Sequence, residues 1–309
     1  METQGTLSAE PGPAVVPASA GLTGLQARAK DYLELTKPRI TALVLVTAAA
    51  GFTMASPGPL ALGLLAHTLL GVALVAGGTS AMNQVLERDV DALMSRTRSR
   101  PLPAGRISTV PAAVFSGALA AGGIAYLAFT VNALTAGLAA ASFALYDFLY
   151  TPLKRVHSFS TVIGAVPGAL PILGGWTAAG GALDAGGWSL FGILFLWQLP
   201  HFLALAWILR EDYGGAGLRM LSVGDAGAFH TRHQTLVYTL ALLPMTLLPA
   251  VLGLAGPVYF GAALALGAGF LRVAARFCRD ARGTGARRVF RYSILYLPLL
   301  LLVLVLDRV

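Results

Sequence analysis

Charged residues are scarce in this sequence. They make up 12% of its 309 residues, against about 25% in a typical soluble domain, while 56% are hydrophobic. The mean hydropathy is +0.71, and apolar runs long enough to cross a bilayer recur along the chain. This composition excludes an ordinary soluble domain and predicts a polytopic membrane protein.

Cysteine is nearly absent as well. The single residue, Cys278, excludes an internal disulfide, and no spacing of Cys and His resembles that of a structural zinc site. The sequence holds 36 Gly and 17 Pro, two residues that are more frequent in transmembrane helices than in soluble ones. The expected fold class is therefore an all-α membrane protein.

A secretory signal peptide is also lacking at the start of the sequence. Residues 1–24 are rich in Pro, Ala, Gly, Ser and Thr, no basic segment precedes an apolar core, and Pro17 interrupts the first apolar stretch. The acids Glu2 and Glu10 disfavour a mitochondrial presequence. We expect residues 1–24 to be a disordered tail and residues 25–309 to be a single transmembrane domain.

The apolar runs predict a bundle of nine transmembrane helices, although an alternative count would merge or drop one of the later ones. The boundaries are good to a few residues. The predicted spans are about 40–56, 60–82, 108–129, 133–150, 161–179, 188–209, 235–254, 257–277 and 291–306.

The basic residues support the count of nine. With nine spans, all of the 22 Lys and Arg residues except Arg308 fall on one side of the membrane. The positive-inside rule makes that side, with the N-terminus, cytoplasmic. The net charge of +8 therefore reflects topology, and we expect no nucleic-acid partner. The opposite loops carry almost no charge beyond Asp184, so any chemistry should lie at the cytoplasmic face.

A charged stretch follows the second predicted span directly. In a helix, Asn83, Glu87 and Asp91 stand at i, i+4 and i+8 and share one face over about 12 Å, whereas Asp89 points away from it. Mg²⁺ prefers oxygen ligands and often bridges one or two carboxylates to substrate phosphates. The spacing therefore indicates a magnesium site at the membrane boundary.

The alternative interpretation of this stretch is a solvated helix end. Glu87 could pair with Arg88 and Asp91 with Arg96, as runs of charge usually do. Asn83 favours the metal site, because an amide beside the bilayer with two acids in register is an unusual way to end a span.

Basic residues also end the fourth predicted span, where Lys154 and Arg155 follow Tyr150. Arg can bind a diphosphate through a bidentate fork and Lys as a point charge. Taken alone, these residues are more typical of positive-inside anchoring beside an interfacial Tyr.

The sixth predicted span contains an ionisable residue, which is a functional candidate by default. Trp197 and His201 share a helical face. This histidine could ligate haem iron, shuttle a proton or bond to a neighbouring helix. His67 lacks polar company and is interpreted as structural, and His230 and His233 as loop residues.

These motifs resemble those of the UbiA superfamily of membrane prenyltransferases. Its first motif is matched by Asn83-x-x-x-Glu87-x-x-x-Asp91 followed by Met94-Ser-Arg96-Thr97-x-x-Arg100-Pro101-Leu102. Further segments look like its haem-modifying branch, the protohaem IX farnesyltransferases (haem O synthases). They are Tyr150-Thr151-Pro-Leu-Lys154-Arg155, Gly168-Ala-x-Pro171, Gly175-Trp176, Pro200-His201-Phe202 and Asp212-Tyr213-x-x-Ala216-Gly217. The matches run from about Thr36 to Tyr213 and beyond.

The resemblance implies a UbiA-like prenyltransferase fold of nine helices with its active site at the cytoplasmic face of a bacterial inner membrane. It implies a Mg²⁺-dependent transfer of a farnesyl group from farnesyl diphosphate to a vinyl group of haem B, giving haem O for a downstream enzyme or oxidase. The sequence departs from the superfamily at Glu87, where Asp is common, and at Glu211 and Asp212, which replace a fuller acidic motif. One Mg²⁺ is expected, and a second stays open.

The resemblance also suggests a role for each candidate residue. The Mg²⁺ ligands are Asn83, Glu87 and Asp91. The diphosphate is assigned to Arg96, Arg100, Lys154 and Arg155. Candidates for shielding the farnesyl cation are Tyr150, Trp197 and Phe202. His201 is assigned to haem, and Asp212 is a further substrate-binding candidate. The prenyl tail is expected among small residues such as Gly77, Gly78 and Ser80, and membrane lipid is expected as a further partner.

Two other functions are compatible with parts of this pattern. A UbiA-type enzyme could use a quinone or phenolic acceptor in place of haem. A transporter could also hold polar groups within a bundle, but it should carry charges or broken helices near the midplane. Here the acids gather at one face, which favours an enzyme.

Overall fold

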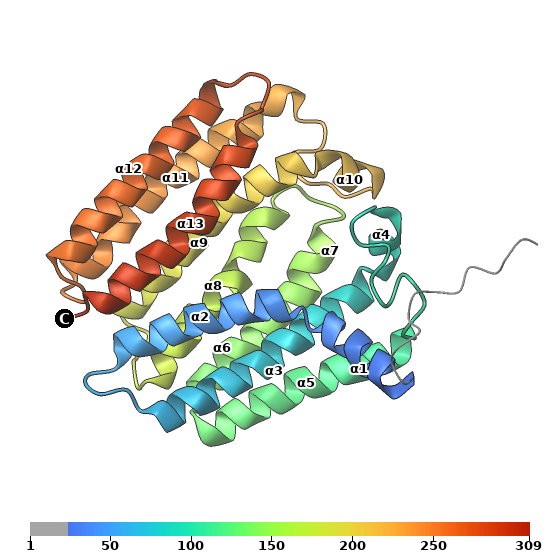
Figure 1. The fold of residues 1–309 in the computed structure, drawn as a ribbon, viewed down its shortest axis with the longest axis horizontal. Helices are drawn as coiled ribbons and strands as arrows, with labels where there is room; N and C mark the ends of the chain where they lie inside the picture. The colour runs from blue at the N-terminus through green and yellow to red at the C-terminus, as the bar shows by residue number, and fades with distance from the viewer. Residues whose placement is uncertain (1–23) are drawn as a thin grey trace, which may run out of the picture.

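The computed structural model describes residues 24–309 and is helical throughout that range apart from its turns (Figure 1). The predicted tail, residues 1–24, lies outside the described residues except for Gly24, where helix α1 begins. Within the described range, 9 helices are long and apolar enough to cross a membrane. The predicted all-α bundle of nine spans is confirmed.

The spans lie close to their predicted positions. They are α2 (Pro38–Ala55), α3 (Leu62–Leu86), α5 (Thr109–Thr130), α6 (Ala133–Ala144) continued by η1 (Leu145–Tyr150) and α7 (Thr151–Leu153), α8 (Ser160–Ala178), α9 (Ala185–Ile208), α11 (Phe229–Val251), α12 (Pro257–Arg279) and α13 (Ala286–Leu306). The remaining short helices are α1 (Gly24–Leu35), α4 (Arg88–Leu93), α10 (Arg210–Gly215) and η2 (Ala226–Ala228). Figure 1 shows α1, α4, α7 and α10 at one end of the bundle.

Local sequence explains several helix starts. Pro38 and Pro257 occupy the first helical positions of α2 and α12, where a missing N–H costs nothing and the fixed φ suits the helix. The Asn132 side chain accepts a hydrogen bond from Thr135 N and caps α6. Caps of this kind typically contribute about 1 kcal/mol.

Glycine lets α2 and α8 pack with their backbones in contact. A Cβ on Gly51 would strike the Ile172 carbonyl of α8, and a Cβ on Gly175 would strike the Ala48 carbonyl of α2. Small residues allow this close approach between membrane helices. It helps to make α8 the most buried span of the bundle.

Two sequence-based interpretations of histidines need correction. His230 and His233 are not loop residues, because α11 begins at Phe229, earlier than the predicted 235. The Asp225 carboxylate accepts hydrogen bonds from the backbone N–H of His230 and Thr231, which stabilises the polar first turn as helix.

His67 was expected to lack a polar partner, but the structure gives it one from another helix. Its Nδ1 lies 2.6 Å from the hydroxyl of Tyr126 on α5. The contact joins α3 to α5, which suits the structural interpretation of His67.

Candidate active site

The three predicted metal ligands lie at the junction of α3 and α4. Glu87 leaves the regular helix, with φ −104° and ψ 11°. Even so, Glu87 N bonds to Asn83 O at 3.0 Å and Asp91 N to Glu87 O at 2.7 Å, so the spacing of four residues continues across the junction. All three side chains are buried.

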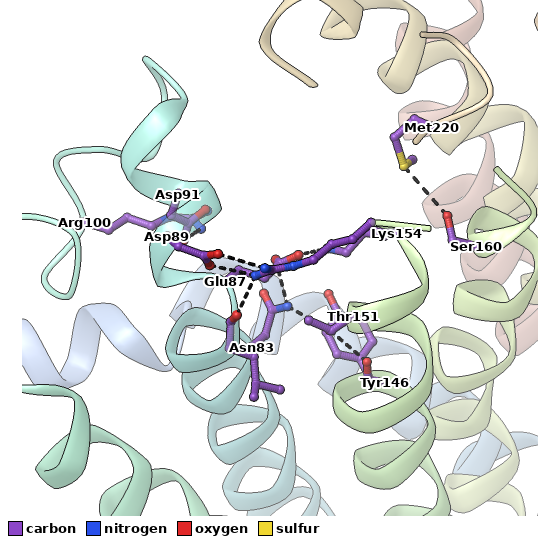
Figure 2. A network of polar contacts seen from close by, with 12 residues as sticks. Asn83, Glu87, Asp89, Asp91, Arg100, Tyr146, Thr151, Lys154, Ser160 and Met220 are labelled. Carbon is purple, nitrogen blue, oxygen red and sulfur yellow. Dashed lines mark hydrogen bonds and ion pairs between the residues drawn. The ribbon is translucent and has the colours of Figure 1, made fainter. Parts of the chain in front are cut away.

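Asn83 is held by hydrogen bonds on both sides of its amide. Its Nδ2 donates to Glu87 Oε2 at 2.9 Å and to Thr151 Oγ1 at 3.1 Å, and its Oδ1 accepts from Lys37 Nζ at 2.9 Å. Figure 2 shows Asn83, Glu87 and Thr151 facing one another between α3 and α7. The amide thus connects three segments that are distant in sequence.

Lys37 is a site residue that the sequence reasoning missed. It adopts a left-handed conformation, with φ 48°, directly before Pro38, and such strained backbone is often found at functional sites. Burial and, to a smaller extent, the positive charge of Arg100 lower the pKa of Lys37 to about 8. The available signal was a basic residue within Thr36-Lys37-Pro38-Arg39, at the very start of an apolar run.

Both predicted metal carboxylates form ion pairs with predicted diphosphate-binding cations. Lys154 Nζ lies 2.6 Å from Glu87 Oε1, and Arg100 NH1 lies 2.7 Å from Asp91 Oδ2. Burial disfavours the Lys154 ammonium, but Tyr150 and Glu87 outweigh this effect and hold the pKa of Lys154 above its usual value. Acids and bases therefore form one compact buried cluster.

Tyr150 completes one side of this cluster. The Lys154 ammonium lies 4.8 Å from the centre of its ring, a distance suited to a cation–π interaction. A Cβ on Gly164 of α8 would collide with the same ring. Gly164 therefore makes the space that Tyr150 occupies.

Arg155 is bound by Asp89 and by the end of α3. Its guanidinium donates to both carboxylate oxygens of Asp89, at 2.7 and 2.8 Å, and to Leu86 O at 3.0 Å. The hydrogen bonds from Arg155 lower the pKa of Asp89. Arg155 thus fastens the loop after α7 to the last turn of α3, and its predicted contact with diphosphate stays a prediction.

Helix α10 and the loop that follows it pack against the α4 region and against the end of α7. Ser95 Oγ lies 3.4 Å from Asp212 Oδ1, and Arg219 N bonds to Lys154 O at 2.9 Å. Buried apolar residues join the two regions; they are Val90, Met94, Ala206, Ala216, Leu218 and Met220. Asp212 therefore lies beside the first motif, whereas Glu211 pairs with Arg210 at the surface.

The remaining candidates differ in their surroundings. Arg96 is exposed in the loop after α4. Trp197, His201 and Phe202 form an aromatic group on α9, with the rings of Trp197 and His201 stacked at 5.1 Å. In the part of the chain that the structure describes, no hydrogen bond or ion pair joins this group to the Asn83 cluster.

Asp147 is a second residue that the sequence reasoning did not select. It lies in η1, a π-helix of 6 residues, and π-helical turns are often found at functional sites. Its side chain is fully buried, and both carboxylate oxygens lack a hydrogen-bond partner among residues 24–309. A buried carboxyl group without a partner costs free energy.

The donor set decides what kind of metal site is possible. Over residues 24–309, no group of three or more His, Cys, Asp or Glu side chains is placed to hold a metal ion. Asn83, Glu87 and Asp91 supply one amide and two carboxylates, a set that fits Mg²⁺ completed by water and substrate phosphate. Lys154 and Arg100 each occupy one oxygen of these carboxylates, so they compete with a metal ion for the same groups.

The structure is thus a membrane bundle with a buried cluster of acids and bases at one end. The chain matches the UbiA prenyltransferase family over residues 44–299 and belongs to that family.

Relatives extend over nearly the whole chain. A protein of Solibacter usitatus named Protoheme IX farnesyltransferase is 44% identical over 288 residues, covering 90% of this chain and 99% of its own. A protein of the same name from Myxococcus xanthus is 45% identical over 282 residues, covering 91% and 95%.

Solved structures share the fold at low sequence identity. A digeranylgeranylglyceryl phosphate synthase has a TM-score of 0.78 and 18% identity, covering 91% of this chain and 98% of its own. A UbiA homolog from Archaeoglobus fulgidus bound to GPP and Mg²⁺ has a TM-score of 0.66 and 18% identity, covering 89% and 99%. The predicted UbiA-like fold is confirmed.

Proposed function

We propose that this protein transfers the farnesyl group of farnesyl diphosphate to the terminal carbon of a vinyl group of haem B, while water adds to the neighbouring carbon and loses a proton, forming haem O and releasing diphosphate. The observation that carries the proposal is the buried cluster in which Glu87 and Asp91 are paired with Lys154 and Arg100. The names of relatives that are 44–45% identical over about nine-tenths of the chain support the choice of donor and acceptor.

The first task of the site is to hold the diphosphate. Lys154 and Arg100 are expected to leave Glu87 and Asp91 and to bind phosphate oxygens, Arg100 through its fork and Lys154 as a point charge. Lys37, already hydrogen-bonded to Asn83, adds a third cation. Because cations and carboxylates separate only when both receive new partners, metal and diphosphate should bind together.

The second task is to favour ionisation of the allylic bond. Mg²⁺, when held by Asn83, Glu87 and Asp91, would neutralise the charge that develops on the leaving diphosphate. Binding of Mg²⁺ and GPP by the homolog from Archaeoglobus fulgidus supports a metal here. We propose one Mg²⁺ ion. Asp212, next to Ser95, is the carboxylate available to a second Mg²⁺ ion.

The third task is to guide the carbocation to its acceptor. The Tyr150 ring borders the cluster, and its π face can stabilise a nearby cation. Trp197 and Phe202 extend the aromatic lining along α9, and His201 is the proposed contact for haem. We place the site at the cytoplasmic face of a bacterial inner membrane, because nearly all basic loops lie at its end of the bundle. A haem O-using oxidase is the proposed recipient of the product.

A reconstituted assay tests this function. Purified protein in lipid nanodiscs receives Mg²⁺, farnesyl diphosphate and haem B, and mass spectrometry follows haem O and diphosphate. We expect both products in equal amounts, and none after chelation of Mg²⁺. Farnesylation of a quinone or phenol in place of haem would contradict the assigned acceptor. Absence of diphosphate release with every acceptor would contradict prenyl transfer and favour a transporter.

A further inference from the structure

His201 of α9 is held by two aromatic rings and one hydroxyl. Its ring stacks with that of Trp197 and tilts against that of Phe290, with centroids 5.1 and 4.8 Å away and interplanar angles of 25° and 31°. Its Nδ1 lies 2.8 Å from Ser293 Oγ on α13. Two aromatic rings and one hydroxyl thus hold the imidazole, while the residue as a whole is only half-buried.

The hydrogen bonds of Ser293 determine the tautomer of His201. The Ser293 hydroxyl carries one hydrogen, and it donates this hydrogen to Phe290 O at 2.7 Å. Toward His201 the hydroxyl oxygen can therefore only accept, so His201 Nδ1 must be the protonated nitrogen. Nε2 then bears a lone pair. Within the described residues, it has no hydrogen-bond partner.

Trp197 fixes this arrangement from the same helix as His201. Its Nε1 donates to the backbone carbonyl of Ser293 at 2.8 Å, which locks α9 to α13 at the level of the histidine. The imidazole is therefore held in place and oriented by a second residue. Metal-ligating histidines in proteins typically donate their other N–H in this manner.

The position of His201 suits a ligand that enters from the membrane. His201 lies seven residues before Ile208, the last residue of α9, and Ser293 lies seven residues after Ala286, the first of α13. Both are therefore about 10 Å inside the bundle from the end that carries the Asn83 cluster. Phe202, which is 38% exposed, lies edge-on to the His201 ring and adds apolar surface beside it.

We propose that His201 ligates the iron of the haem acceptor through Nε2, and that Ser293 is the positioning residue that fixes its tautomer. A neutral imidazole with one free lone pair is the usual proximal ligand of haem iron. A proton shuttle would instead need a polar partner at Nε2. The inference rests on the proposed function, because that function supplies haem as the acceptor.

Spectroscopy of the bound acceptor tests the inference apart from turnover. Haem B is titrated into purified protein without farnesyl diphosphate, and the Soret band and the resonance Raman iron–histidine band of the ferrous state are recorded. Wild type should show a histidine ligand. His201→Ala should lose that band and bind haem about 10–100-fold more weakly. His67→Ala is the matched control, since this intramembrane histidine has its Nδ1 bonded to Tyr126 and should leave the spectrum unchanged.

Two further variants separate ligation from folding. His201→Gly with added imidazole should recover the ligand spectrum, because imidazole fits the space that the side chain leaves. Ser293→Ala should shift the iron–histidine band and weaken haem binding about tenfold, whereas Ser293→Thr, which keeps the hydroxyl, should restore both.

The outcomes distinguish this inference from the proposed function. If haem O forms but His201→Ala retains the wild-type spectrum, iron ligation by His201 is wrong and the proposed function stands. An unchanged Raman band in Ser293→Ala would overturn the positioning role of Ser293. If wild type neither binds haem B saturably nor forms haem O, the proposed function fails and the inference fails with it.

Discussion

At the scale of single residues, the site depends on cations that are buried beside carboxylates. The spacing of Asn83, Glu87 and Asp91 was sufficient to predict that they cooperate, since a helix keeps i and i+4 on one face. The cations that pair with them are harder to predict from the sequence. Lys37 lies 46 residues from Asn83 in sequence, and no local pattern predicts that a lysine at the start of α2 reaches the end of α3.

Removing the charge of Lys37 should weaken binding of the diphosphate substrate. A charged hydrogen bond typically contributes about 1.5–3 kcal/mol, so Lys37→Gln should raise KM for farnesyl diphosphate about 10–100-fold. Steady-state kinetics in nanodiscs measure the effect. Arg39→Gln is the control, because Arg39 is exposed two residues away; an equal change in both variants would show that only the general surface charge matters.

At the scale of helices, the two differences from sequence expectation have physical causes. The start of α11 was missed because its first turn is polar, and the cap from Asp225 comes from outside the helix. The π-helix η1 was missed because its sequence, Leu145–Tyr150, is as apolar as a regular span. Apolar composition locates a span, but it does not specify the turn type within it.

The cap of α11 should make stability depend on pH. Burial alone would raise the pKa of Asp225, but hydrogen bonds from Thr231 and His230 outweigh it and lower that pKa. The stabilisation is therefore fully present above the unfolded pKa of about 3.9 and is lost as pH falls through the lower folded value. Asp225→Asn should unfold at a lower temperature than wild type at pH 7, with a gap that narrows below about pH 4.

Thermal unfolding of detergent-solubilised protein measures this cap. Thr231→Val is the comparison, because it removes the side-chain hydrogen bond to Asp225 and leaves the carboxylate in place. A gap between wild type and Asp225→Asn that stays constant down to pH 3 would contradict the assignment of the stabilisation to the ionised carboxylate.

The unpaired carboxyl of η1 should reduce stability. Replacing buried Asp147 by Val, which has no polar atoms in its side chain, removes a group without a partner and should raise the unfolding temperature by a few degrees. Asp147→Asn keeps polar atoms and should gain less. Calorimetry or a thiol-independent dye assay records the shift; a lower unfolding temperature for Asp147→Val would show that the carboxyl has a stabilising partner.

At the scale of the whole molecule, the nine spans and their basic end could be predicted, because hydropathy and the distribution of Lys and Arg follow directly from the bilayer. The arrangement of the spans could not. The contact of α2 with α8 depends on Gly51 and Gly175, and the contact of α4 with the loop after α9 depends on apolar residues far apart in sequence. Such pairings require the folded structure.

The orientation of the bundle can be measured with single cysteines in a Cys278→Ser background. Ser158→Cys lies at the end with the Asn83 cluster and Ala182→Cys at the other end, and both positions are exposed. In intact cells, a membrane-impermeant thiol reagent should label Ala182→Cys and spare Ser158→Cys until the membrane is opened. The reverse pattern would place the site on the outer face.

The central claim is that Asn83, Glu87 and Asp91 bind Mg²⁺ for ionisation of farnesyl diphosphate, and one pair of variants tests it most directly. Asp91→Ala and Asp89→Ala each remove one carboxylate from α4, but Asp91 is buried in the cluster and Asp89 faces Arg155 outside it. With both variants folded in nanodiscs, the account predicts no haem O from Asp91→Ala at any Mg²⁺ concentration, and near wild-type haem O from Asp89→Ala. Haem O formation by Asp91→Ala at the wild-type rate would contradict it.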